Sequence, residues 1–434
     1  MGFRLKRLQA QLERELWLRP ALASLFAIAM ALLAYWLGGR YEGKIALKID
    51  EESLVALLSI FASSMLSVAT FTVSAIVAAA STVSTSTTYR ASQYVLSDKK
   101  AQLVLSAFIA AFIYSIFSIL ALKAFEYGAV GRFILFLGLL LIVGFVLIAF
   151  INWVDHAMQL GRQETILTKL TEVALASINP ETVHHWGAHA WDGRVPPDSC
   201  AVYPQTYGYV VGLDMSRLQA KAEEMQATII LATRPGEVSE VTAAIAYISP
   251  ASTATDEFIT TVCTAVAIGQ RREATDDLRF NLINLTETAD RALSSAVNDP
   301  GTAINVLHLQ LKVLAHWAEV SQQSQTAELS YQRLSVLPMT AEELVTDSFS
   351  PIARDGAGFI EVGIRLQKVL LALVRLNYPP LTQAAQHMSA VALELAEPAL
   401  VAQIQRERLR GLAKQVQDLA DQLQSFPSID QIAL

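Results

Sequence analysis

The sequence has only two cysteines, Cys200 and Cys263, among 434 residues, so no disulfide framework is expected. It also lacks the short motifs of common enzymes: a phosphate-binding loop, GxGxxG, GxSxG and paired carboxylates in a catalytic context. The formal net charge is −7, with no basic face to bind nucleic acid. These absences predict a protein that is not an enzyme, needs no cofactor and has no nucleic-acid partner.

Charge is absent from Ser53 to Tyr89, a stretch longer than the roughly 20 residues that one helical crossing of a bilayer needs. At 100° per residue, a set of its hydroxyl residues falls within an arc of about 80° on a helix. We call this set the hydroxyl ribbon: Ser59, Ser63, Ser67, Thr70, Ser74, Ser81, Thr85 and Thr88. The opposite side is apolar, except at Thr72. A helix of this kind suits a bilayer and faces either a close neighbour or a water-filled path.

Two interpretations of the ribbon stay open at this stage. Small residues at helical spacing form dry packing seams between transmembrane helices, and neutral hydroxyls also line hydrated pores. The two interpretations are compatible if the packing seam surrounds the axis of an oligomer. A helix through Tyr89 would be about 55 Å long, against a hydrocarbon core of about 30 Å. It therefore either projects beyond the bilayer or breaks near Ser81 to Thr88, where helix propensity is weak.

Three further segments bracket roughly 20 uncharged residues each, enough to span a bilayer. They are Arg19 to Arg40, Lys100 to Lys123 and Arg132 to Asp155. The sequence thus predicts four transmembrane helices within a domain of residues 1–158. Basic residues are about twice as frequent in the leader, the middle loop and the segment after the fourth span as in the other loops. This bias predicts a multi-pass protein of a bacterial inner membrane with both termini in the cytoplasm.

The remainder reads as a mostly helical α+β cytoplasmic domain with one small β unit. We expect a connecting helix and loop in residues 159–200, the β unit in 201–250 and a helical domain in 251–434. The strands are expected at Tyr207 to Gly212, Ala227 to Thr233 and Val241 to Ile248, with a helix capped by Asp214 after the first of them. All later elements are expected to be helices, the first of them running from Thr255 to Ser295.

The segment Ala289 to Ala303, ADRALSSAVNDPGTA, contains the most distinctive motif of this half. Asp299 followed by Pro300 predicts a helix start, because the carboxylate accepts free N–H groups and proline suits the first turn. The same helix N-terminus could instead hold an anionic ligand. The candidate residues of that ligand junction are Asp290, Arg291, Asn298, Asp299 and Thr302.

The pattern Arg-Ala-Leu-Ser-x-x-x-Asn-Asp-Pro-x-Thr-Ala in this segment resembles the signature of a bacterial predicted-membrane-protein family, domain of unknown function 2254. Other pieces agree in order: Phe108 to Tyr114 in the third span, Arg234-Pro235-Gly236 in the β unit, and Gly269 to Arg272 followed by Asp276-Asp277. Ser295, Val297 and Gly301 depart from the commoner residues, and the Arg90 region lacks the usual Pro-Arg pair. The resemblance implies a membrane topology and brings no established activity.

The histidines His184, His185 and His189 lie near Asp192. On a helix, His185 and His189 would share a face, a spacing that zinc sites use. Clustered histidines in a soluble loop are more often plain surface residues, and no cysteine lies close. We therefore predict no metal site, with His185 and His189 as the candidates if one exists.

Together these features predict a homo-oligomeric channel or pore for ions or small solutes. Its partners would be the lipid bilayer, further copies of the chain and the permeant, and its cytoplasmic domain would act as vestibule or gate. The alternative is a membrane-anchored sensory or scaffold protein that acts through its cytoplasmic helical domain. A ligand cleft near Asn298 to Thr302 and a dry ribbon would favour that alternative.

Overall fold

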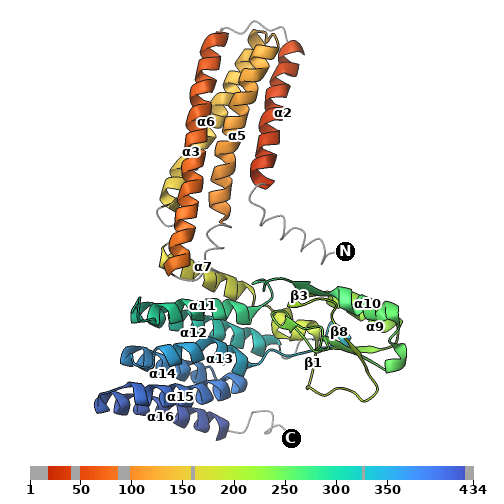
Figure 1. Ribbon diagram of the computed structural model, residues 1–434, viewed down its shortest axis with the longest axis vertical. Coiled ribbons are helices and arrows are strands. Elements are labelled where there is room, and N and C mark those ends of the chain that lie inside the picture. Colours follow the sequence, from red (N-terminus) through yellow and green to blue (C-terminus); the bar gives the residue numbers. More distant parts are fainter. Residues whose placement is uncertain (1–17, 41–48, 87–97, 158–161, 325–327, 426–434) are drawn as a thin grey trace. The chain divides into compact units, whose positions relative to one another are not determined.

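The computed structural model describes residues 18–40, 49–86, 98–157, 162–324 and 328–425 (Figure 1). The chain is mostly helical and forms two compact units, an N-terminal unit Met1–Ile166 and a C-terminal unit Leu167–Leu434. The finer division into four parts, with boundaries at 158, 200 and 250, remains a prediction.

The N-terminal unit is a bundle of α2 (Leu18–Arg40), α3 (Glu51–Ser86), α5 (Lys99–Ala124) and α6 (Ala129–Ala157) (Figure 1). Three helices are long and apolar enough to cross a membrane, over Glu51–Ser84, Lys100–Ala124 and Ala129–Val154. The helix α2 has only a shorter apolar stretch, Ser24–Trp36. A fourth crossing, by α2, therefore remains a prediction.

Helix α5 lies at the centre of this bundle and packs against α2, α3 and α6. The bundle core has two apolar clusters, one around Leu54, Leu58 and Leu135 and one around Met65, Phe108 and Trp153. The Tyr114 hydroxyl donates to the Leu135 carbonyl at 2.8 Å, which ties α5 to α6. The apolar side of α3 predicted from the sequence is thus the side that packs inside the subunit.

Helix α3 continues for 36 residues to Ser86 without a break, which is about 54 Å at 1.5 Å per residue. The helix is therefore unbroken through most of Ser81 to Thr88, where a break was one of two expected outcomes, and the last two residues of that range lie outside the described residues. Asp50 accepts from the Ser53 N–H at 3.1 Å and so satisfies one free donor at the helix start. Thr88 lies outside the described residues.

The C-terminal unit begins with α7 (Gln163–Ala176), whose first residues belong to the other unit, and the short α8 (Pro180–Val183). A five-stranded sheet has the order β1-β8-β4-β6-β2, and a three-stranded sheet has the order β5-β3-β7. The strands are β1 (Ala188–Ala190), β2 (Cys200–Val202), β3 (Gly208–Leu213), β4 (Thr228–Leu231), β5 (Val238–Ser239), β6 (Ala246–Ser249), β7 (Val266–Gly269) and β8 (Tyr331–Val336). Helices α9 (Met215–Glu224) and α10 (Asp256–Ala265) pack against each other within this region.

The sheets thus take three strands from outside the predicted β unit of residues 201–250. Strand β8 pairs in parallel with both β1 and β4, although it lies about 100 residues after β4. Strand β7 interrupts the helix that was predicted from Thr255 to Ser295, because Val266 to Gly269 pair with β3 instead. Short β-branched runs fit helix and strand equally, and the partner strand decides between them.

Six helices pack together in two layers, which we call the helical stack (Figure 1). They are α11 (Leu278–Leu293), α12 (Pro300–Ser324), α13 (Ala341–Asp355), α14 (Ile360–Arg375), α15 (Pro379–Ala399) and α16 (Gln403–Ser425). Helix α13 packs between α11 and α15, and α14 packs between α12 and α16. The stack therefore has a first layer of α11, α13 and α15 and a second layer of α12, α14 and α16, as in solenoids built from helix pairs.

Candidate functional site

The hydroxyl ribbon on α3 faces away from its own subunit. Ser59, Ser63, Ser67, Thr70, Ser74 and Ser81 are all exposed. On the opposite side of the helix, Leu54 and Leu58 are fully buried and Ala62, Met65 and Ala69 nearly so. The remaining ribbon positions are Thr85, which belongs to α3, and Thr88, which lies outside the described residues. Since the described part of the subunit leaves the ribbon positions from Ser59 to Ser81 exposed, lipid, water or a second chain can cover them.

Four ribbon hydroxyls, those of Ser63, Ser67, Thr70 and Ser74, bond to the backbone of their own helix. Ser63 donates to the Ser59 carbonyl at 2.7 Å, Ser67 to Ser63 at 2.9 Å and Ser74 to Thr70 at 3.0 Å. This back-bonding satisfies the hydroxyl proton in a medium that offers no water. The oxygen keeps lone pairs free to accept another bond. The ribbon is therefore compatible with close packing and also presents acceptor oxygens along the helix.

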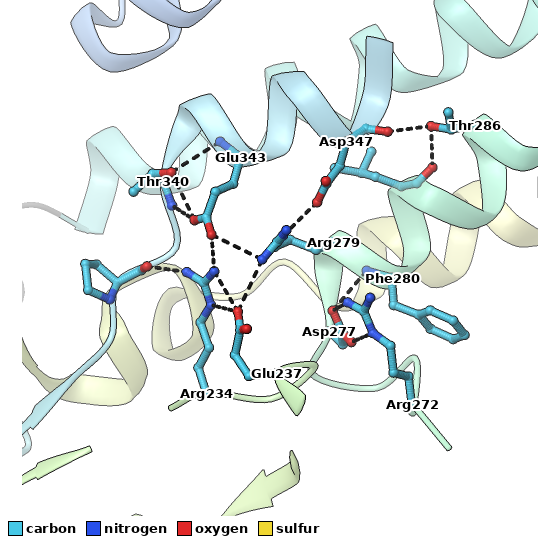
Figure 2. A network of polar contacts seen from close by, with 12 residues as sticks. Arg234, Glu237, Arg272, Asp277, Arg279, Phe280, Thr286, Thr340, Glu343 and Asp347 are labelled. Carbon is cyan, nitrogen blue, oxygen red and sulfur yellow. Dashed lines mark hydrogen bonds and ion pairs between the residues drawn. The ribbon is translucent and has the colours of Figure 1, made fainter. Parts of the chain in front are cut away.

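In the C-terminal unit, an ion network joins the turn after β4 to the starts of α11 and α13 (Figure 2). Its members are Arg234, Glu237, Arg279, Glu343 and Asp347. The Arg234 side chain, only 3% exposed, donates to Glu237 at 3.0 and 3.1 Å. It also donates to the Pro338 carbonyl and to Glu343.

Arg279 completes the ion network from the first turn of α11. Its Nη1 donates to Glu237 at 3.2 Å and to Glu343 at 3.1 Å, and its Nε donates to Asp347 at 2.6 Å (Figure 2). Two guanidinium groups thus face three carboxylates that come from separate parts of the chain. Because buried charges are stable only when paired, the network fixes the β4–β5 turn against the helical stack.

The ion network also shifts the pKa values of two of its members, Glu343 and Arg279. Burial alone would raise the pKa of Glu343, but hydrogen bonds from Arg234 and from the Thr340 backbone hold that pKa below its ordinary value. Burial would lower the pKa of Arg279, and the hydrogen bond to Asp347 raises it instead. Both residues therefore stay charged near neutral pH, which suits a structural junction and gives no proton donor for catalysis.

A second contact lies beside this network and uses the motif pieces singled out in the sequence. Arg272 binds Asp277 through two hydrogen bonds of 2.7 and 2.8 Å, and Asp277 also caps α11 by accepting from the Phe280 N–H at 2.9 Å (Figure 2). Gly236, with φ +95°, lies directly against the Asp277 carboxylate. The turn Arg234-Pro235-Gly236 and the segment Gly269 to Asp277 therefore meet in space.

Sequence reasoning missed Glu237, Arg279, Glu343 and Asp347. Only Glu343 had a local signal: it forms a capping box with Thr340, in which each side chain bonds the backbone of the other. A Thr-x-x-Glu pattern before an apolar helix is a recognised helix start. The pairing of Arg279 with Asp347 spans 68 residues and has no such signal.

At the proposed ligand junction, Asp299 caps α12. Its Oδ1 accepts from the Thr302 N–H at 3.1 Å and its Oδ2 accepts from the Thr302 hydroxyl at 2.6 Å. Asn298 adopts a positive φ of 52° in the preceding turn, and Arg291 is exposed. Both Asp299 oxygens thus serve the helix start, which supports the structural interpretation of this junction.

Asp290 belongs to different surroundings. Its Oδ1 is buried and accepts no hydrogen bond among the residues that the structure describes. Burial, followed by repulsion from Asp355 on α13, raises the pKa of Asp290 to about 7. The structure therefore relates Asp290 to α13 and leaves the rest of the predicted junction, Asp299 and Thr302, to the start of α12.

The histidine cluster does not form the predicted helix face. The chain leaves the helix at His184, and His185 and Trp186 have positive φ values of 51° and 56°. His189 then lies in β1, so the one-turn spacing on a helix that zinc sites use is lost. No group of three potential metal ligands occurs in the described ranges of the chain.

The match with a known family covers both units. Residues 13–372 match the family described as Predicted membrane protein (DUF2254). The chain belongs to this family. Neither a curated protein nor a solved structure matches it. The family and the three long apolar helices together identify a multi-pass membrane protein, as the resemblance in the sequence predicted.

Proposed function

We propose that the protein is a homo-oligomeric inner-membrane channel for ions or small solutes, with both termini in the cytoplasm. The observation that carries this proposal is the exposure of the hydroxyl ribbon on α3. Among the residues that the structure describes, the ribbon positions from Ser59 to Ser81 are exposed, while the opposite side of the same helix is packed. Assembly with the α3 helices around an axis would place the ribbon at that axis, where hydroxyl oxygens favour weak, multi-site passage.

The C-terminal unit would serve as vestibule or gate in this arrangement. The ion network supports such a role, because it holds the sheets and the helical stack together as one body. The sensory or scaffold alternative gains less support. Its expected ligand site at Asn298 to Thr302 is taken up by the cap that Asp299 provides to Thr302.

The test is flux through the purified full-length protein in sealed vesicles. Potassium, chloride and small neutral solutes would each be followed under a range of voltage, membrane tension and pH. Passage of at least one solute above protein-free vesicles is the expected result. If no solute passes under any condition, the channel proposal is wrong and the sensory alternative takes its place.

A further inference from the structure

One buried side chain of the bundle has no hydrogen-bond partner at either of its polar atoms. Gln102, in the first turn of α5, is only 3% exposed. Its amide nitrogen and its carbonyl oxygen both lack a partner among the residues that the structure describes. Gln102 also belongs to the apolar stretch Lys100–Ala124, which is long enough to cross a membrane and offers little water. An amide left in this state costs free energy, so the described packing does not satisfy this side chain.

A hydrogen bond to a carboxylate lies one turn away and joins α5 to α6. His156, in the last turn of α6, donates from Nε2 to Oδ1 of Asp98 at 2.9 Å. The same oxygen accepts from the Ala101 N–H at 2.9 Å and so caps α5. Within the described part of the chain, Oδ2 of Asp98 accepts no hydrogen bond. Asp98 therefore ties the start of α5 to the end of α6 and keeps one oxygen free.

Gln102 is a second possible partner for Asp98, on the same helix. The two residues are four apart, and long side chains of a helix lean toward its N-terminus, over the preceding turn. Rotation of the Gln102 side chain can therefore bring its amide to Oδ2 of Asp98, and Gln–Asp hydrogen bonds at this spacing stabilise helices. Asp98 can thus be held by α6, through His156, or by α5 itself, through Gln102.

The apolar core at this end of the bundle connects the Asp98 contact to the helix that carries the hydroxyl ribbon. One cluster packs Ala69 of α3, Ala101 and Val104 of α5 and Trp153 of α6. The rings of Trp153 and His156 lie 6.3 Å apart, so the contact borders this cluster. Movement of α6 away from α5 would therefore also loosen the packing of α3. Helix α6 is the last long apolar helix before the chain enters the C-terminal unit.

We propose that Asp98, Gln102 and His156 form a latch that opens by an exchange of partners. In the closed state, which is the one described, His156 holds α6 to α5. In the open state Asp98 bonds Gln102 instead, which satisfies the buried amide and leaves the end of α6 free to move. This inference rests on the channel of the proposed function and gives the C-terminal unit a device that acts on α3 through α6.

The first measurement follows the distance between α5 and α6 and needs no flux. In the full-length protein in vesicles, Cys200 and Cys263 become serine. Spin labels are attached to Lys100→Cys on α5 and Val154→Cys on α6, both exposed near the latch. Labelled copies are diluted with unlabelled ones, so that the distances measured by pulsed electron spin resonance lie within one subunit. The native protein should show a short distance and a minor longer one.

The variants shift the two distances in opposite directions. His156→Leu should raise the share of the longer distance about tenfold, the change expected from the loss of one hydrogen bond to a charged group. His156→Gln should keep the short distance, because its amide also donates to Asp98. Gln102→Leu should leave only the short distance. Unchanged distances in both leucine variants would overturn the proposal.

Thermal melts show whether the Gln102 amide is unsatisfied in the closed state. Gln102→Leu should raise the melting temperature, because it replaces an unpartnered buried amide by an apolar group of similar size. Gln367→Leu is the matched control, since Gln367 is 1% exposed and both of its polar atoms bond to Ser389. It should lower the melting temperature and leave the distance between α5 and α6 unchanged. A lower melting temperature for Gln102→Leu would show that its amide has a partner and would refute the exchange.

Flux measured on the same vesicles separates the failure of this inference from the failure of the channel proposal. His156→Leu should raise flux and Gln102→Leu should lower it, each by about tenfold. Shifted distances without any flux would keep the latch and remove the channel. Flux with unchanged distances in both variants would keep the channel and remove the latch.

Discussion

Gly236 lies against the carboxylate of Asp277, in a backbone conformation with φ +95° that favours glycine. The contact closes the turn after β4 onto the start of α11, next to the ion network. A Cβ at position 236 would overlap the Asp277 carboxylate, which Arg272 holds in place with two hydrogen bonds.

Gly236→Ala should therefore lower the free energy of unfolding by about 3 kcal/mol, from backbone strain and from displacement of Asp277. Gly193→Ala is the matched control, because Gly193 has φ +82° and no atom within 4 Å of its Cβ position. This control substitution should lower the free energy of unfolding by only about 1 kcal/mol, the part that comes from backbone strain. Thermal melts of the purified protein measure both, and equal losses would show that the contact with Asp277 contributes nothing.

Asp299 offers a test of the structural interpretation of the ligand junction. Asp299→Ala should cost about 1 kcal/mol and Asp299→Asn much less, since asparagine also accepts the bond from Thr302. Thermal stability and flux would be measured on both variants. Equal loss of flux in the two, with unchanged melting temperatures, would point to a ligand role.

The buried carboxyl of Asp290 predicts a pH dependence of stability. Its pKa is about 7 in the folded chain and 3.8 in its ordinary state, so the folded chain holds the extra proton between these values. The free energy of unfolding should therefore fall as the pH rises from about 4 to about 7 and level off above. Asp290→Asn should remove this pH-dependent loss of stability. The variant should therefore melt at a higher temperature than the native protein at pH 8 and near the native temperature at pH 4. A gain that is the same at every pH would contradict this account.

The predicted topology can be checked with single cysteines in sealed cells. Gly128 stands between α5 and α6, and its Cβ position is open, so Gly128→Cys should fold normally. It should react with a membrane-impermeant thiol reagent from outside, as should Gly43→Cys. Gln93→Cys should not react until the cells are opened. Labelling of position 93 from outside would reverse the orientation.

The sequence predicted the features that depend on residues close together in the chain, and it missed those that depend on residues far apart. The apolar helices, the Asp214 and Asp299 caps and the amphipathic helices of the stack are local patterns, and the structure contains them. The strand β8 and the pairing of Arg279 with Asp347 depend on partners far along the chain. Such pairings leave no periodicity in the sequence, and the pattern therefore predicts a helix through Val266 to Gly269 and no element at Tyr331 to Val336.

The ribbon itself was predicted from spacing alone, and the structure adds the side it faces. Ser67 and Ser74 are exposed on the ribbon, and Ser64 is exposed about 60° outside its arc. All three donate to the carbonyl four residues earlier. Ser64→Leu is thus a control for Ser67→Leu and Ser74→Leu, with the same substitution on the same helix.

Flux through vesicles containing these variants, with oligomer mass measured in parallel, tests the central claim most directly. If the ribbon lines a wet axis, Ser67→Leu and Ser74→Leu should block flux while the oligomer persists, because leucine makes the route a dry constriction. Ser64→Leu should keep both flux and mass. Undiminished flux in Ser67→Leu and Ser74→Leu would contradict the claim, and a loss of oligomer mass in these variants would show that the ribbon is a packing seam instead.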